Sequence, residues 1–248
     1  MEEQRPPFLC GMNEKEAFFS LFYEEESFLF DLEKSARSRQ VPIVRREMAQ
    51  FLQLLLMIKK PQTILEVGTA IGYSALLMSQ FLPENGKILT IERNPLMWQE
   101  AQQQFKRAEK WLQQQVGLSV LANEQSKFLP QPDKIELKIG DAAQILPQLT
   151  ATFDFVFLDS AKAQYINFLP EILRLLKPEG LLVTDNVLQA GEIMRSKYLL
   201  TRRERTTHRR MRQYLRAISH QPELSTFYFG MADGVTVCVK KGAKTGRE

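Results

Sequence analysis

The sequence contains few of the residues on which disulfide-rich and zinc-binding proteins depend. Among its 248 residues are two cysteines, Cys10 and Cys238, and two histidines, and neither kind is spaced as a ligand set. We therefore expect neither a disulfide framework nor a zinc site. The scarcity of cysteine is typical of a protein in a reducing, cytoplasmic environment.

Long hydrophobic runs and a strong charge of one sign are also missing. Even the apolar segment 51–58 is far shorter than the ~20 residues that a membrane-crossing helix needs. The first 16 residues carry no basic region followed by an apolar stretch, so we expect no secretory signal and no membrane partner. A formal net charge of +4 is too modest to identify a partner unless the charges are concentrated in one place.

What the sequence does contain is a regular alternation of short apolar runs and amphipathic segments. With 44% hydrophobic residues, a chain of this length can bury one substantial core, and we expect a single domain over residues 1–248. Five runs predict parallel strands and two more predict a closing antiparallel pair, at residues 64–67, 87–92, 134–139, 153–158, 181–184, 226–229 and 235–239. This alternation indicates an α/β fold with a doubly wound, mostly parallel sheet.

Three segments stand apart from the alternation. Residues 1–60 predict an N-terminal helical cap, because apolar and charged residues recur there at helical spacing and Pro42 interrupts them. The glutamine-rich stretch 113–132 is interpreted as an insertion, to which we assign no function. The third segment, 195–216, is basic.

The stretch 63–75, TILEVGTAIGYSA, is typical of a ligand-binding turn between a buried strand and a helix. Its glycines, Gly68 and Gly72, have the spacing G-x-x-x-G and not the G-x-G-x-x-G that cradles a pyrophosphate. An acid at Glu66 would repel a phosphate but favour a sulfonium or ammonium group. We therefore expect a nucleoside without phosphates, bound close to the backbone.

Polar side chains follow the predicted strands at their carboxyl ends, where open α/β sheets bind ligands. Glu92 ends the second strand, close to the offset of about 20 residues at which an acid holds ribose hydroxyls. Asp159, Asp185 and Asn186 follow two other strands and offer three oxygen ligands, which suits Mg²⁺. Each acid alone is as well explained by a helix cap or a solvated strand end, but their convergence favours a binding site.

Five motifs in this order resemble those of the metal-dependent O-methyltransferases that use S-adenosylmethionine, the family of the catechol and caffeoyl-CoA enzymes: ILEVGTAIGYSA, LTIERN, GDA, FVFLDSAKAQY and VTDNV. The resemblance runs from about Leu32 to Lys240 and is interrupted by the insertion. It implies a Rossmann-like class I methyltransferase fold, with a C-terminal antiparallel hairpin and N-terminal helices, and a homodimer.

The resemblance also implies roles for single residues. Contacts to S-adenosylmethionine would come from Val44, Glu66, Gly68, Ser74, Glu92, Asp141, Ala142 and Asp159. Mg²⁺ or another divalent cation would be held by Asp159, Asp185 and Asn186, and Lys162 of the D-x-x-K motif would be catalytic together with Asp159. The alternative for Lys162 is a surface lysine at a helix start, where the helix dipole disfavours a cation.

Basic residues crowd the segment 195–216, RSKYLLTRRERTTHRRMRQYLR, which contains the single acid Glu204. Arginine outnumbers lysine there, and the guanidinium fork suits phosphate. A solvated basic helix is the usual meaning of a charge run, but the position just after Asn186 favours an RNA partner. The candidate RNA-binding residues are Arg195, Arg202, Arg203, Arg205, Arg209, Arg210 and Arg212.

In finer detail, VTDNVLQAG, the arginine-rich segment and MADGVTVCVKK most resemble the bacterial branch of the family that acts on tRNA. That branch methylates 5-hydroxyuridine at the wobble position to give 5-methoxyuridine. The 5-hydroxyl and 4-carbonyl of this base form a vicinal oxygen pair, which can chelate a cation as a catechol does. Two alternatives stay open: a small-molecule catechol-type O-methyltransferase, and a catalytically silent RNA-binding or dimeric scaffold.

Overall fold

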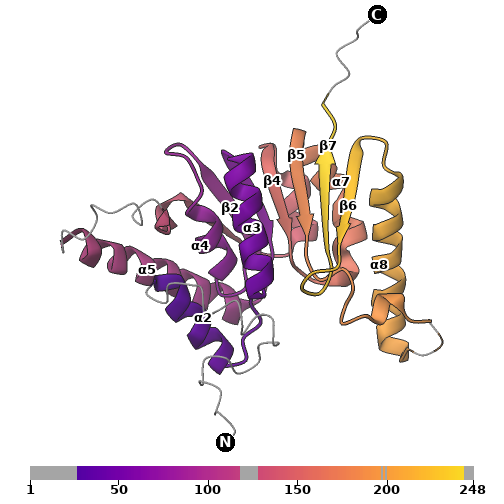
Figure 1. Ribbon diagram of the computed structural model, residues 1–248, viewed down its shortest axis with the longest axis horizontal. Helices are drawn as coiled ribbons and strands as arrows, with labels where there is room; N and C mark the ends of the chain where they lie inside the picture. The colour runs from indigo at the N-terminus through magenta and orange to yellow at the C-terminus, as the bar shows by residue number, and fades with distance from the viewer. Residues whose placement is uncertain (1–26, 118–127, 197, 199, 243–248) are drawn as a thin grey trace, which may run out of the picture.

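A seven-stranded sheet forms the centre of the molecule (Figure 1). The computed structural model describes residues 27–117, 128–196, 198 and 200–242. The strands are β1 (Thr63–Val67), β2 (Lys87–Glu92), β3 (Ile135–Ile139), β4 (Phe153–Leu158), β5 (Leu176–Thr184), β6 (Leu224–Phe229) and β7 (Val235–Lys240). Their order is β3-β2-β1-β4-β5-β7-β6, with β1 to β5 parallel and the β6–β7 hairpin antiparallel. This confirms the predicted fold class.

Helices and single turns connect the strands. The α-helices are α2 (Phe28–Ser38), α3 (Arg46–Lys59), α4 (Tyr73–Ser79), α5 (Pro95–Gly117), α6 (Ala142–Ile145), α7 (Tyr165–Leu175) and α8 (Arg202–His220). The 3-10 turns are η4 (Pro132–Lys134), η5 (Leu146–Gln148), η6 (Lys162–Gln164) and η7 (Glu192–Met194). None of the helices in the described ranges is both long enough and apolar enough to cross a membrane.

Both faces of the sheet are covered, which makes a three-layer molecule. Phe155 and Phe157 of β4 pack in the core shared with α2, α3, α4 and α5. The alternate residues Val156 and Leu158 pack in a second core with α6, α7 and α8. Because both faces of β4 are buried, its sequence is a near-continuous apolar run rather than an alternating one.

Two segments differ from the sequence pattern. β5 begins at Leu176, five residues before the predicted start, because Lys177-Pro178-Glu179-Gly180 lies within the strand and not in a turn. A register shift between Phe153 and Phe155 absorbs the irregular part of the pairing between β4 and β5. α5 runs to Gly117, so the first residues of the segment 113–132 are helical. Residues 118–127 of that segment, and 1–26 of the predicted cap, lie outside the described ranges.

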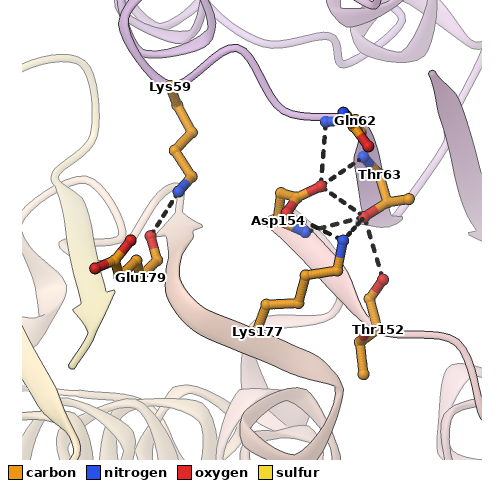
Figure 2. A network of polar contacts seen from close by, with 7 residues as sticks. All are labelled: Lys59, Gln62, Thr63, Thr152, Asp154, Lys177 and Glu179. Carbon is orange, nitrogen blue, oxygen red and sulfur yellow. Dashed lines mark hydrogen bonds and ion pairs between the residues drawn. The ribbon is translucent and has the colours of Figure 1, made fainter. Parts of the chain in front are cut away.

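A polar network joins the amino ends of β1 and β4 to β5 (Figure 2). Asp154 accepts hydrogen bonds from the backbone N–H groups of Gln62 (3.1 Å) and Thr63 (2.9 Å), and Lys177 Nζ lies 3.1 Å from its other oxygen. Burial raises the pKa of Asp154, but the bonds from Lys177 and Thr63 outweigh it and the net shift is downward. The network fixes the sheet at the edge opposite to the strand carboxyl ends.

Candidate active site

A cleft opens at the carboxyl ends of β1, β2 and β4. This edge of an open α/β sheet is where such folds bind small molecules. The predicted cofactor contacts that line it are Val44, Gly68, Ser74, Glu92, Asp141, Ala142 and Asp159. Backbone bonds continue the sheet past the strand ends: Gly68 N–H donates to Ile91 O and Asp159 N–H to Val67 O, each at 3.0 Å. The segments that follow β1, β2 and β4 are thereby held side by side.

Gly68 is the point of closest approach between two of these segments. Its φ of +107° is a conformation that residues with a side chain rarely adopt. A Cβ atom at this position would lie 1.9 Å from the carbonyl oxygen of Asp159. Only glycine therefore allows the turn after β1 to lie directly against the end of β4.

Glu92 occupies the end of β2 with its carboxylate already oriented. Its oxygens accept hydrogen bonds from the backbone N–H groups of Ala70 (2.9 Å), Arg93 (2.9 Å) and Asn94 (2.8 Å). A carboxylate has about four acceptor positions, so one remains for a hydroxyl in the cleft. Asp141, which also lines the cleft, accepts from Ala143 N–H at 2.9 Å and caps α6. Asp141 therefore has two roles: it is the N-cap of α6 and it forms part of the cleft wall.

Glu66 lies behind the cleft and not in its wall. It is fully buried, and its two oxygens accept hydrogen bonds from the hydroxyls of Ser74 and Thr90, each at 2.5 Å. Burial raises the pKa of Glu66 to about 7. Ser74 lines the cleft and donates its hydroxyl to Glu66, so Glu66 is linked to the cleft only through Ser74. The sequence predicts instead a direct contact between Glu66 and S-adenosylmethionine.

The predicted metal ligands and the predicted catalytic lysine meet beside the cleft. Asp159 Oδ1 lies 2.9 Å from Lys162 Nζ and 3.2 Å from Asn186 Nδ2. The Asp185 side chain is turned away from solvent and accepts the backbone N–H of Asn186 at 2.6 Å. Burial, followed by the charge of Asp159, raises the pKa of Asp185 to about 7. Two carboxylates, an amide and an ammonium group thus share one site.

This donor set fits a hard divalent cation, although it is not a cluster of acids alone. The described residues contain no group of three or more His, Cys, Asp or Glu side chains that could hold a metal ion. Mg²⁺, however, needs only one or two carboxylates and completes its shell with amide, water and substrate oxygens. The repulsion between Asp159 and Asp185 is what such a cation would relieve. Asn186, held at a φ of +58°, presents its oxygen when its amide rotates by half a turn.

α8 has a buried face and a basic outer face. Met211, Tyr214 and Ile218 are fully buried against the sheet. The exposed arginines follow each other at helical spacing and line an open groove; they are Arg205, Arg209, Arg212 and Arg216. Arg216 belongs to this stripe although the predicted RNA-binding set omits it. Thr201 and Glu204 form a capping box that fixes where the helix starts.

The other predicted RNA-binding residues lie elsewhere. Arg210 is partly buried, and its Nη1 donates to the carbonyl oxygen of Ala163 in η6 at 3.2 Å. Arg195 is exposed, and its carbonyl oxygen bonds to the buried His208 ring at 3.2 Å. Arg202 and Arg203 begin α8, but their side chains lie outside what the structure describes.

The sequence pattern did not single out several residues of the site. Thr69, Tyr73, Gln164 and Phe168 also line the cleft. Thr69, Tyr73 and Gln164 lie within the quoted motifs and Phe168 lies three residues after one, but the motifs alone assign none of the four a role.

The fold and the cleft together define a class I methyltransferase: a mostly parallel sheet closed by an antiparallel hairpin, with a glycine turn beside a cleft at the carboxyl ends of the strands. The profile of the family described as O-methyltransferase matches residues 22–241. The chain therefore belongs to the S-adenosylmethionine-dependent O-methyltransferase family.

Individual relatives agree with this membership. The chain is 32% identical over 179 residues to a catechol O-methyltransferase of Niastella koreensis, covering 70% of this chain and 72% of that one. It is 28% identical to caffeoyl-CoA O-methyltransferase 2 of Populus trichocarpa, over 76% of this chain and 71% of that one. Among solved structures, a putative caffeoyl-CoA O-methyltransferase from Staphylococcus aureus superimposes with a TM-score of 0.74 at 26% identity, covering 92% and 100% of the two chains.

Proposed function

We propose that the protein transfers a methyl group from S-adenosylmethionine to the 5-hydroxyl of 5-hydroxyuridine at the tRNA wobble position, with Mg²⁺ or another divalent cation. The product is 5-methoxyuridine. The observation that carries this choice of acceptor is the arginine stripe of α8, because the same helix contacts η6, which contains Lys162.

The groove on α8 offers two kinds of contact that single-stranded RNA uses. Arg205, Arg209, Arg212 and Arg216 present guanidinium forks to successive phosphates. Tyr198 lies in the same groove with 78% of its surface exposed, and unpaired bases stack on such rings. An anticodon loop supplies both phosphates and unstacked bases.

The residues of the cleft have distinct tasks in this reaction. The turn at Gly68 and the oriented carboxylate of Glu92 would hold the methionine and ribose parts of the donor. Asp159, Asp185 and Asn186 would hold the cation. When bound, a divalent cation lowers the pKa of an acceptor hydroxyl and fixes its direction.

Methyl transfer then breaks one bond and forms one. The acceptor oxygen forms a bond to the methyl carbon as the S–CH₃ bond breaks, which leaves S-adenosylhomocysteine and a methyl ether. Lys162, whose Nζ is 2.9 Å from Asp159, would accept the proton that the hydroxyl loses, but only in its neutral amine form, after it has given up the proton of its ammonium group.

A second candidate acceptor is a small catechol-like molecule. The names of the relatives favour it, since the Niastella protein is a catechol O-methyltransferase and the Populus protein acts on caffeoyl-CoA. In this case the arginines of α8 are solvated and contribute nothing to acceptor binding. The two candidates therefore differ in whether the groove is needed for activity.

Nucleoside mass spectrometry separates the two candidates. The purified protein, S-adenosylmethionine and Mg²⁺ are incubated with tRNA from cells that lack the protein, or with catechol. We expect 5-hydroxyuridine to be converted to 5-methoxyuridine, and Arg209→Glu to lower this conversion through a weaker affinity for tRNA. Lys106→Glu is the matched control, because Lys106 is an exposed cation on another helix. Unchanged 5-methoxyuridine in the deleted cells, with no 5-hydroxyuridine accumulating, contradicts the proposal.

The homodimer and the cytoplasmic location belong to the proposal as well. α3 exposes Leu54, Met57 and Ile58, and β6 exposes Phe227 and Phe229. Phe51 of α3 lies 5.0 Å from Phe229 between ring centroids, which joins the two elements into one apolar surface. Such a surface supports a second copy as its partner. Light scattering of the purified protein tests it, and a monomer at micromolar concentration contradicts it.

A further inference from the structure

The segment 159–165, called here the catalytic loop, carries both Asp159 and Lys162 and has few local supports. It leaves β4 at its carboxyl end, passes through η6 and enters α7 at Tyr165. Neither η6 nor α7 has a side-chain hydrogen bond at its N-cap. Within the loop, the Lys162–Asp159 ion pair of 2.9 Å sets the distance between the two side chains, so the placement of their backbone relative to the rest of the site depends on contacts from other elements as well.

Arg210 supplies one such contact from α8. Its neighbour Arg209 is exposed in the groove, whereas Arg210 is partly buried and donates from Nη1 to Ala163 O at 3.2 Å. Ala163 directly follows Lys162 in η6. A hydrogen bond from a charged donor to a carbonyl is stronger than a neutral one, and this bond holds the backbone next to the lysine.

Tyr165 holds the other end of the loop. Its ring is fully buried and meets Tyr214 of α8 edge-on, with 5.6 Å between the ring centroids. Its hydroxyl accepts the backbone N–H of Ser160 at 3.2 Å and lies 3.4 Å from the carbonyl oxygen of Asp185. One hydroxyl thus joins the residue after Asp159 to the backbone of Asp185.

We propose that Arg210 and Tyr165 are positioning residues, which hold the catalytic loop between α8 and the end of β5. Arg210 is then not an RNA contact, although it lies in the middle of the arginine run. The inference rests on the proposed roles of Asp159 and Lys162, but it does not depend on tRNA being the acceptor. Since misplacing catalytic groups by ~1 Å can cost about 100-fold in rate, loss of either contact should lower kcat.

The adjacent pair Arg209→Ala and Arg210→Ala is the sharpest test, because both changes remove one arginine from the same helix. With tRNA as acceptor, we expect Arg210→Ala to lower kcat by about 10- to 100-fold while the Kd for tRNA changes less than about 2-fold. Arg209→Ala should show the reverse, a higher Kd for tRNA with kcat at saturation retained. Added guanidinium should restore part of the activity of Arg210→Ala, and Lys106→Ala should match the unmodified protein throughout.

Two further measurements keep failure of this inference separate from failure of the tRNA proposal. If catechol is the acceptor, Arg210→Ala should still lower kcat while Arg209→Ala has no effect. Titration with Mn²⁺ alone should show weaker binding for Tyr165→Phe, which keeps the ring against Tyr214 and removes only the hydroxyl. If Arg210→Ala does not fold, Tyr165→Phe decides through its kcat and its Mn²⁺ affinity.

The inference is overturned by either of two results. One is an Arg210→Ala variant that loses tRNA affinity with kcat intact, as expected of a phosphate contact. The other is a folded Tyr165→Phe variant with the kcat and Mn²⁺ affinity of the unmodified protein.

Discussion

Gly68→Ala should damage the active site more than it damages the fold. The added Cβ would lie 1.9 Å from the carbonyl oxygen of Asp159 and 2.8 Å from its carbonyl carbon. Both atoms belong to backbone, so no side-chain rotation can make room. The turn after β1 or the end of β4 must move, and the end of β4 carries Asp159.

The size of the effect follows from two contributions. The first is strain, since an alanine held at a φ of +107°, in a sparsely populated region, costs roughly 1–3 kcal/mol. The second is displacement: heavy atoms rarely approach a Cβ within 3.0 Å, so Asp159 or the turn must withdraw by roughly 1 Å. A shift of this size at catalytic groups lowers the rate by about 100-fold, equivalent to about 2.7 kcal/mol of transition-state stabilisation.

Gly191→Ala is the matched control for strain. Gly191 has a φ of +82°, but a Cβ there would meet only the flexible end of Met194 at 3.5 Å, an ordinary contact. Thermal unfolding and methyl-transfer kinetics are measured for both variants, together with the Kd for S-adenosylhomocysteine. Both should unfold a few degrees earlier, and only Gly68→Ala should lose ligand affinity and kcat/KM. Equal kinetics for the two variants would refute the reasoning.

Three further changes test other parts of the site and the sheet. Asp159→Ala should abolish activity that depends on a divalent cation, and full activity of this variant in chelator would contradict the metal assignment. Because burial raises the pKa of Glu66 to about 7, the folded protein binds more protons than the unfolded chain between about pH 4.3 and 7, and stability falls as pH rises through this window. Glu66→Gln should remove this fall, of at most about 4 kcal/mol. The free energy of unfolding is measured in urea at pH 5 and pH 8, and an equal loss of stability between the two pH values in the variant and the unmodified protein would count against this assignment. The pKa of Asp154 is lowered, so the stability that this carboxylate contributes is present above about pH 3.9 and is lost in acid. Asp154→Asn should lower the free energy of unfolding, measured in urea, by about 1 kcal/mol at pH 7 and by less at pH 3.

The strand ends were predictable because burial leaves a clear signal. In β4, the run Phe155–Leu158 is apolar on both faces and stops at Asp159, so the sequence marks both the strand and the first polar residue after it. The same reasoning applies to Glu92 at the end of β2 and to Asp185 after β5. Parallel strands bring such residues to one edge of the sheet, and for this reason the cleft contains most of the predicted cofactor contacts.

What the sequence could not supply is the direction of individual side chains. The position of Glu66 just before the glycine turn predicts a ligand contact. In the fold its side chain points into the interior from β1 and accepts hydrogen bonds from Ser74 and Thr90. Lys177-Pro178-Glu179-Gly180 has the composition of a turn, yet tertiary pairing and a bulge place it in β5.

In the same way, the run of arginines makes it difficult to predict from the sequence which face of α8 is buried. Met211, Tyr214 and Ile218 define the buried face, but they are separated by so many charges that the segment reads as uniformly basic. Once the phase is known, Arg209 and Arg210 face different surroundings, because successive residues of a helix are turned by about 100°. Charge density alone therefore places Arg209 and Arg210 in one RNA-binding set, although Arg209 lines the groove and Arg210 contacts the catalytic loop.

The contacts of the catalytic loop explain why donor and acceptor binding should be linked in this fold. The loop is in contact with the donor turn through the close approach of Gly68 to Asp159, and with α8 through Arg210 and Tyr214. Methyl transfer requires the acceptor oxygen, the methyl carbon and the sulfur to be in line, so a loop held from only one side would lose that alignment. In the proposed function α8 binds the acceptor on its outer face and holds the loop on its inner face, which would place both partners relative to the same seven residues, 159–165.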